Sequence, residues 1–337
     1  MKRPFMVLVA LAFGTVFWGS RNAPALKVVE YQIPRANAFP HDPAVGPDGV
    51  VWYTDQANSY IGRLDPTTGK FTDWPTPTPK SGPHGIVVAA DGGVWYTGNA
   101  AGRIGRLDPK TGTIKEYALP EAAKDPHTPI FQGGKLWFTV QAGNIIGHLD
   151  PATGEVKLFH PRTNGAKPYG IVPVGKTDLW ADLFGTNKLA HVVGTTGEIH
   201  EIDLPNAATR PRRIAVDHDD NVWYSDYSRG YLGFLGFPKG GKPVFKEWPS
   251  PSGASSQPYG MAIGPDGRIW YNESARGVNL MVAFNPATEK FETVPIPTPG
   301  AVVRHIAVDY ERSRMWLALS GTGRIGRIDF GAAEKTP

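Results

Sequence analysis

Short apolar stretches separated by turn residues repeat along nearly the whole chain, and their spacing predicts the fold. A hydrophobic residue followed by tryptophan recurs seven times, at intervals of 42 to 47 residues. A repeat of about 40 to 50 residues with four short strands per unit is typical of β-propeller blades. The pattern predicts an all-β chain that forms a seven-bladed β-propeller of four-stranded antiparallel blades. The tryptophans, which we expect in the core between blades, are Trp52, Trp95, Trp137, Trp180, Trp223, Trp270 and Trp316.

The unit over residues 83–120 shows how the pattern defines individual strands. The nearly continuous apolar stretch 83–88 indicates an innermost strand buried between neighbouring blades. Asp91 and Gly92 follow as a hairpin turn, because glycine accepts the positive φ that such a turn needs. The remaining strands of the unit are predicted at 94–97, 103–107 and 114–117.

The two ends of the repeat region predict how the ring closes. Residues 28–34 resemble the outer strand at 114–120, whereas the last unit stops after Asp329. The N-terminal strand is therefore expected to complete the seventh blade, which removes two exposed sheet edges. The predicted propeller spans residues 26–331, with a C-terminal tail at 332–337.

Residues 1–25 have the character of a signal peptide. Lys2 and Arg3 precede an apolar stretch at 5–18, and the small residues Ala23 and Ala25 suit cleavage. The apolar stretch is shorter than the roughly 20 residues of a membrane-spanning helix. We therefore expect a periplasmic or secreted protein with no membrane association beyond export; the alternative is that the segment is retained as an uncleaved anchor.

Composition and charge narrow the class of partner. The chain has 40 Gly, 32 Pro, no Cys and a formal net charge of +4. Three basic residues of the expected signal peptide carry most of that charge, so nothing points to a nucleic-acid partner. The absence of Cys excludes disulfides and thiolate metal sites. We expect a monomer that binds a small molecule at the mouth of the propeller channel.

Titratable and aromatic residues recur where the innermost strands begin. They lie 10 to 12 residues before each tryptophan and should gather at one mouth of the channel: His41, His84, His127, Tyr169, Arg212, Tyr259 and Arg304. Three residues after the tryptophans, Asp55, Asp226 and Glu273 are expected at the same mouth. Titratable groups clustered in a concavity indicate a functional site. The alternative is that they satisfy one another, for example as an ion pair of Arg212 with Asp226.

A metal site of three histidines is a further alternative. His41, His84 and His127 belong to successive units. Neighbouring blades should separate such positions by about 5–10 Å, which is wide for one tetrahedral ion.

These motifs resemble the streptogramin lyase (virginiamycin B lyase) family of seven-bladed propellers. The resemblance rests on Gly82-Pro83-His84-Gly85-Ile86, on Leu136-Trp137-Phe138-Thr139 and on Arg103-Ile104-Gly105-Arg106-Leu107, and it runs over residues 27–330. The family opens a cyclic depsipeptide by elimination at its ester with Mg²⁺. The resemblance therefore implies a carbon–oxygen lyase.

The resemblance also implies roles for particular residues. His127 would be the general base and Asp125 a metal ligand, while His84 and Tyr169 would orient the ester. The family has glutamates at the positions of Asp125 and Gln141. Because Gln141 brings no charge, the affinity for Mg²⁺ should be lower. The rest of the expected substrate-binding ring is His41, Arg212, Tyr259 and Arg304.

Two other functions are compatible with the same residues. A lactonase-type propeller could use Asp55, Asp226 or Glu273 with a divalent cation. A binding or scaffold propeller without turnover could use the tyrosine and arginine face to hold an anionic or carbohydrate ligand. Fold alone does not decide among these functions.

Overall fold

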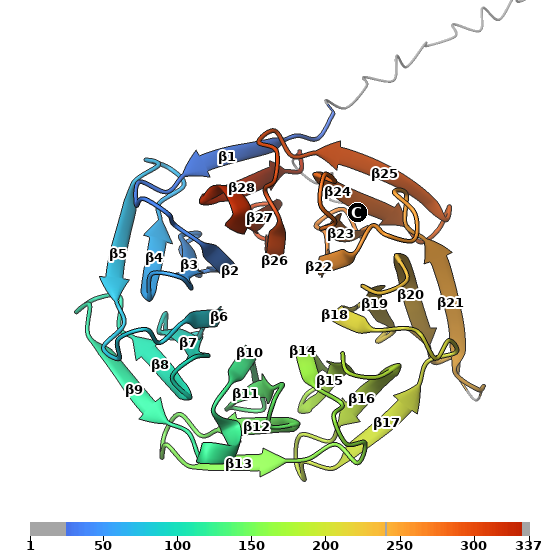
Figure 1. Ribbon diagram of the computed structural model, residues 1–337, viewed down its shortest axis with the longest axis horizontal. Helices are drawn as coiled ribbons and strands as arrows, with labels where there is room; N and C mark the ends of the chain where they lie inside the picture. The colour runs from blue at the N-terminus through green and yellow to red at the C-terminus, as the bar shows by residue number, and fades with distance from the viewer. Residues whose placement is uncertain (1–24, 240, 332–337) are drawn as a thin grey trace, which may run out of the picture.

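The computed structural model describes residues 25–239 and 241–331, which form a closed ring of blades (Figure 1). Each of the seven sheets has four antiparallel strands, as the tryptophan repeat predicts. The expected signal peptide and the tail at 332–337 lie outside the described residues, apart from Ala25.

Each blade runs from an innermost strand at the channel to an outermost strand at the rim. The innermost strands are β2 (Pro40–Val45), β6 (Pro83–Val88), β10 (Pro126–Gln132), β14 (Pro168–Val174), β18 (Pro211–Val216), β22 (Pro258–Ile263) and β26 (Val303–Asp309). The second strands are β3 (Val51–Asp55), β7 (Val94–Gly98), β11 (Lys135–Val140), β15 (Asp178–Leu183), β19 (Val222–Asp226), β23 (Ile269–Glu273) and β27 (Arg314–Leu319). The third strands are β4 (Tyr60–Leu64), β8 (Arg103–Leu107), β12 (Ile145–Leu149), β16 (Lys188–Val192), β20 (Tyr231–Gly236), β24 (Leu280–Asn285) and β28 (Arg324–Asp329). The outermost strands are β5 (Phe71–Pro75), β9 (Ile114–Ala118), β13 (Val156–Phe159), β17 (Ile199–Asp203), β21 (Val244–Pro249), β25 (Lys290–Pro295) and β1 (Val28–Gln32).

The ring closes through its N-terminal strand. β1 pairs antiparallel with β28, from Val28 opposite Ile328 to Gln32 opposite Arg324. The Glu30 carboxylate also accepts a hydrogen bond of 3.0 Å from the backbone N–H of Thr298. The seventh blade is thus assembled from both ends of the chain, as predicted.

Two helices of the 3₁₀ type, η1 (Glu121–Ala123) and η2 (Ser320–Thr322), interrupt the otherwise all-β structure. Within the described part of the chain, neither has the length or apolar character needed to cross a membrane.

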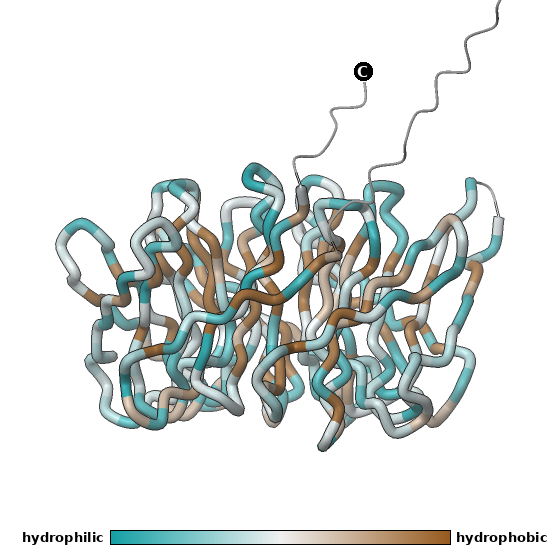
Figure 2. Tube along the Cα trace, turned by 90° about the horizontal axis from the view of Figure 1, so that it is seen from above, coloured by the Kyte–Doolittle hydropathy of each residue, from teal (hydrophilic) through white to brown (hydrophobic). Residues whose placement is uncertain are grey.

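The repeated motifs pack in the same way in several blades. All seven repeat tryptophans are buried between blades, with at most 5% of their surface exposed. In the first blade the Tyr53 ring lies over Gly62, where an added Cβ would be only 2.0 Å from the ring, so glycine is required. Hydrophobic segments lie inside the blades and polar turns lie on the outer faces (Figure 2).

Every innermost strand has a β-bulge near its start, and this bulge determines which side chains face the channel. In the first blade Pro40 pairs with Asp55 and Pro43 with Tyr53, so two residues lie opposite Thr54 alone. The same shift occurs in the other six blades. A bulge of this kind re-aims side chains that strict alternation would place on opposite faces.

Two rings of residues result from the bulges. The first ring, nearest the mouth, is His41, His84, His127, Tyr169, Arg212, Tyr259 and Arg304. The second ring, one residue further along each strand, is Asp42, Gly85, Thr128, Gly170, Arg213, Gly260 and His305.

Candidate functional site

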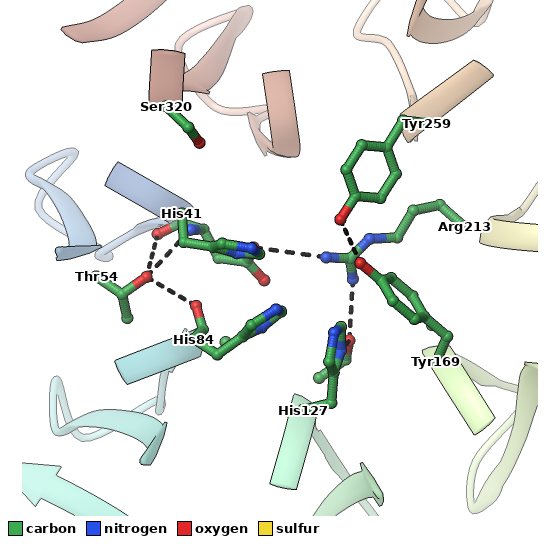
Figure 3. Close-up of polar contacts among 12 residues, drawn as sticks. His41, Thr54, His84, His127, Tyr169, Arg213, Tyr259 and Ser320 are labelled. Carbon is green, nitrogen blue, oxygen red and sulfur yellow. Dashed lines mark hydrogen bonds and ion pairs between the residues drawn. The ribbon is translucent and has the colours of Figure 1, made fainter. Parts of the chain in front are cut away.

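Three histidines and a tyrosine of the first ring lie side by side, with their rings tilted to one another, around one half of the mouth (Figure 3). The ring centroids of His41 and His84 are 3.7 Å apart, as are those of His84 and His127. The Tyr169 ring follows at 4.0 Å from His127. This spacing is shorter than the 5–10 Å expected from strand separations, because the side chains converge toward the channel axis.

Arg213 of the second ring crosses the channel beneath them. Its Nη1 donates to Thr128 Oγ1 at 3.0 Å, and its Nη2 lies 3.5 Å from Asp42 Oδ1. These partners come from three non-adjacent blades, so their meeting places all three side chains on the channel axis. Only 2% of Arg213 and 1% of Asp42 are exposed, which makes this a deeply buried ion pair.

The histidines are held in their neutral form. Burial lowers the pKa of His41, and it lowers the pKa of His84 and His127 well below the ordinary value. Burial and the charge of Arg213 bring the pKa of His305 to about 4. Neutral imidazoles retain a lone pair, so those of the first ring can accept a proton.

His41 has a defined orientation. Its Nδ1 is 2.8 Å from Asp42 Oδ1. Burial alone would raise the pKa of Asp42, but Arg213 and the two neighbouring histidines outweigh it and hold the pKa well below its usual range. An ionised carboxylate only accepts hydrogen bonds, so Nδ1 of His41 carries the proton and Nε2 is the free acceptor.

The other half of the mouth is built from tyrosine and arginine. The hydroxyls of Tyr169 and Tyr259 are hydrogen-bonded to each other. The Arg212 guanidinium lies 4.0 Å from the Tyr259 ring centroid and 4.1 Å from that of Tyr227. Burial alone would raise the pKa of the Tyr259 phenol, but Arg212 and Arg213 beside it bring the pKa below its ordinary value. The Tyr259 hydroxyl is therefore polarised as a hydrogen-bond donor.

Asp125 and Gln141, the predicted metal ligands, lie on adjacent segments at the start of β10 and the end of β11. Asp125 Oδ2 accepts a hydrogen bond of 2.7 Å from the backbone N–H of Ala142, the residue after Gln141. Asp125 Oδ1 is buried and has no partner among the described residues. One carboxylate oxygen is thus free to bind a cation.

The three acids considered for a lactonase do not face the channel, contrary to the expectation for that alternative. Strand alternation places them on the face away from the axis, where each is bound by neighbouring turns. Asp55 accepts from the backbone N–H of Phe39 at 3.0 Å, and Glu273 accepts from Ser250 Oγ at 2.6 Å. Asp226 accepts from the backbone N–H of Arg210 and pairs with Arg229, rather than with Arg212.

The residues that face the channel from the second strands are instead those one position earlier. In the first blade Thr54 Oγ1 accepts from the backbone N–H of Asp42 at 3.1 Å and donates to the backbone carbonyl of His84 at 2.7 Å. Thr97, Thr139 and Ser225 make the corresponding bonds to the carbonyls of His127, Tyr169 and Tyr259. These hydroxyls link four of the seven first-ring residues to the preceding blade and so fix their positions.

Asp182 occupies the same position in the fourth blade. Its Oδ2 accepts from the backbone N–H of Gly170 at 2.9 Å, and its Oδ1 is buried without a partner among the described residues. Burial raises the pKa of Asp182 well above the ordinary value, which favours its protonated form.

One group of potential metal ligands occurs within the two rings. The ligand atoms of His41, Asp42 and His84 lie within 4.8 Å of one another. Arg213 is 3.5 Å from the same Asp42 oxygen, and its positive charge opposes a cation there.

Comparison with known proteins identifies the family. The model of the virginiamycin B lyase family matches residues 20–240 and, in an overlapping alignment, 176–336. The chain belongs to the virginiamycin B lyase family. The resemblance inferred from its motifs is thereby confirmed. A search of curated proteins returned no match.

Solved structures of lyases share the fold along nearly their whole length. Virginiamycin B lyase from Staphylococcus aureus is 27% identical with a TM-score of 0.81, covering 91% of this chain and 100% of that chain. A catalytically inactive histidine-to-alanine variant of the Staphylococcus aureus lyase, solved with quinupristin, is 26% identical with a TM-score of 0.80, at 91% and 100% coverage. A streptogramin B lyase structure, at 24% identity and a TM-score of 0.80 over 90% of this chain and 97% of that chain, shows the shared fold.

Cavities elsewhere in the ring follow the repeat. A cavity of about 650 Å³ opens between the fifth and sixth blades at the opposite mouth, beside Trp223, Trp248 and Tyr310. A similar one of about 640 Å³ lies between the first and second blades, beside Trp52. Because both lie beside a repeat tryptophan and a hairpin turn, they are features of the blade packing.

Proposed function

We propose that this protein is a carbon–oxygen lyase that opens an ester in a cyclic depsipeptide or a related lactone by elimination. The observation that supports it most directly is the ring of neutral, buried imidazoles at one mouth of a propeller of the virginiamycin B lyase family. Such a reaction needs a base that is unprotonated at neutral pH to remove a proton α to a carbonyl, and a neutral imidazole meets this requirement.

In this proposal His127 is the general base. Its Nδ1 shares a hydrogen bond of 2.9 Å with Thr128 Oγ1, which also accepts from Arg213. The ring is thereby fixed between His84 and Tyr169, which would orient the ester. The α proton passes to His127, the C–H electron pair forms the carbon–carbon double bond, and the bond from the β carbon to the ester oxygen breaks. The departing oxygen leaves as a carboxylate.

Asp125 and Gln141 would hold Mg²⁺. The free, buried Oδ1 of Asp125 and an amide oxygen of Gln141 fit an ion that binds through one or two carboxylates and otherwise through water and substrate. When bound, Mg²⁺ would supply positive charge to stabilise the negative charge that develops on the carbonyl oxygen. We further propose that the protein acts as an exported monomer.

The test is ring opening of a cyclic depsipeptide ester such as quinupristin, followed by mass spectrometry of the linear product. We expect His127→Ala to lower kcat/KM by about 10²- to 10⁴-fold. The matched control is His218→Ala, because His218 is 90% exposed and lies in the turn at the opposite mouth. Unchanged turnover in His127→Ala would refute its assignment as base. No turnover in the wild type would refute the lyase proposal itself.

A second measurement tests the metal ligands separately. Gln141→Glu should tighten Mg²⁺ binding in calorimetry because it adds a charged oxygen ligand. Equal Mg²⁺ affinity of the variant and the wild type would place the ion elsewhere or exclude it from this site.

A further inference from the structure

The charges at the mouth do not balance. Arg212, Arg213 and Arg304 all act on the Tyr259 hydroxyl. Asp42 pairs with Arg213, and the other buried acid nearby, Asp182, accepts from the backbone N–H of Gly170 instead of pairing with an arginine. The arginine–carboxylate contacts of the described residues include neither Arg212 nor Arg304. Two positive charges therefore lie uncompensated at the mouth.

Arg212 is held rigidly by aromatic rings instead of by an acid. In addition to Tyr259 and Tyr227, the Phe184 ring centroid lies 5.2 Å and the Tyr169 ring centroid 5.3 Å from its guanidinium carbon. Its Nε atom is buried without a hydrogen-bond partner among the described residues. Cation–π contacts hold the guanidinium in place, and its Nε–H donor has no partner among the described residues.

Arg304, on the other side of Tyr259, also lies beside an aromatic ring and not beside an acid. Its guanidinium carbon lies 5.6 Å from the Phe39 ring centroid, and its Nε is also buried and unpartnered within the described ranges. Tyr259 stands on β22, between β18 with Arg212 and β26 with Arg304. Two arginines thus stand on the strands either side of Tyr259, and guanidinium forks of this kind match a carboxylate.

We propose that Arg212 and Arg304 bind a free carboxylate of the ligand, and that the preferred ligands are acylated amino acids or peptides, ester-containing ones included, that carry such a group. The half-buried rings of Phe39, Phe184 and Tyr227 offer an apolar surface for its side chains. The inference rests on the proposed function in one respect: the bound carboxylate would hold the ester against His127, on the other side of the mouth.

Calorimetric binding tests this without relying on turnover. N-acetylphenylalanine is compared with its uncharged amide, and acetate and inorganic phosphate serve as free oxyanions. We expect the acid to bind at least about tenfold more tightly than the amide and than either free ion. Arg212→Gln and Arg304→Gln should each weaken binding of the acid about tenfold or more but leave the amide unchanged.

Arg276→Gln is the matched control. Arg276 is exposed in the loop after β23, at the same mouth, and the substitution changes the net charge equally. We expect less than a twofold effect, because an exposed charge is screened by salt. An equal loss in this control would show only a general attraction of anions and would overturn the proposal.

Two other binding results would also overturn the carboxylate site. Equal affinity for acid and amide, or no binding of the acid at millimolar concentrations, would overturn the proposal. Tight binding of acetate or phosphate alone would assign the arginines to a free ion instead. Binding of the acid without any ester turnover would support the carboxylate site and refute the lyase proposal. Turnover of a neutral ester with no binding of the acid would support the lyase proposal and refute the carboxylate site.

Discussion

Replacing Arg213 with methionine should destabilise the fold strongly, since it removes one partner of a buried ion pair. The substitution leaves the Asp42 carboxylate, 1% exposed, with no cationic side chain beside it, and Thr128 Oγ1 loses a donor at 3.0 Å. Breaking a buried pair in this way costs about 3–5 kcal/mol. We expect a fall of that size in the free energy of unfolding, measured by urea denaturation at pH 7.

The destabilisation should shrink on acidification. In the wild type the pKa of Asp42 is lower in the folded than in the unfolded protein, so its contribution is present above about pH 4 and lost below it. Without Arg213 that carboxyl protonates more readily in the folded state. The pKa of His127 and His305, which Arg213 helps to lower, should rise as well. From about pH 6 downward, the unfolding free energy of the variant should therefore fall less steeply with decreasing pH than that of the wild type.

Two further variants isolate the cause. Arg314→Met removes an exposed partner of Asp329, 3.0 Å away, and should cost less than about 1 kcal/mol. The double variant Arg213→Met with Asp42→Asn should be less destabilised than the sum of the two single variants. If Arg213→Met lost less than about 1 kcal/mol at pH 7, or if its deficit were independent of pH, the buried-pair argument would be wrong.

The remaining predictions concern stability. Asp182→Asn should raise the unfolding free energy at pH 8 by about 1 kcal/mol and change it little near pH 4, because a raised folded pKa means that wild-type stability falls as pH rises from about 4. Identical pH profiles of the two proteins in chemical denaturation would contradict the raised pKa of Asp182. Deleting residues 26–33 should lower the unfolding free energy by about 3–6 kcal/mol, since it exposes the edge of β28 and removes the buried side chains of Val28 and Ile33. An unchanged denaturation midpoint would show that the ring does not depend on this strand.

The architecture could be predicted from the sequence because every blade repeats the same local rules. The tryptophan period specifies seven units, and the likeness of residues 28–34 to an outer strand specifies closure. The first ring was also predictable, since each member follows the start of an innermost strand by one position. Both predictions depend only on counting along the chain.

The second ring was not predicted, and the reason is the bulge. Strict alternation directs the residue after His41 away from the channel, whereas the structure turns Asp42 inward with it. Arg213 was missed for the same reason, although a charged residue within an apolar strand is a signal that could have found it. Asp55, Asp226 and Glu273 were expected to face the channel, but the channel-facing position on each second strand is one residue earlier.

Because the Arg213 side chain crosses the channel axis, the mouth is closed on its inner side. Three of the seven second-ring positions are glycine and contribute no side chain, and the arginine reaches across to partners in the first and third blades. A molecule that enters beside the histidines must leave by the route it came. In the proposed lyase reaction, product would share this path with incoming substrate. Inhibition by product should then be competitive, and release of a bulky product, rather than bond breaking, would limit the rate.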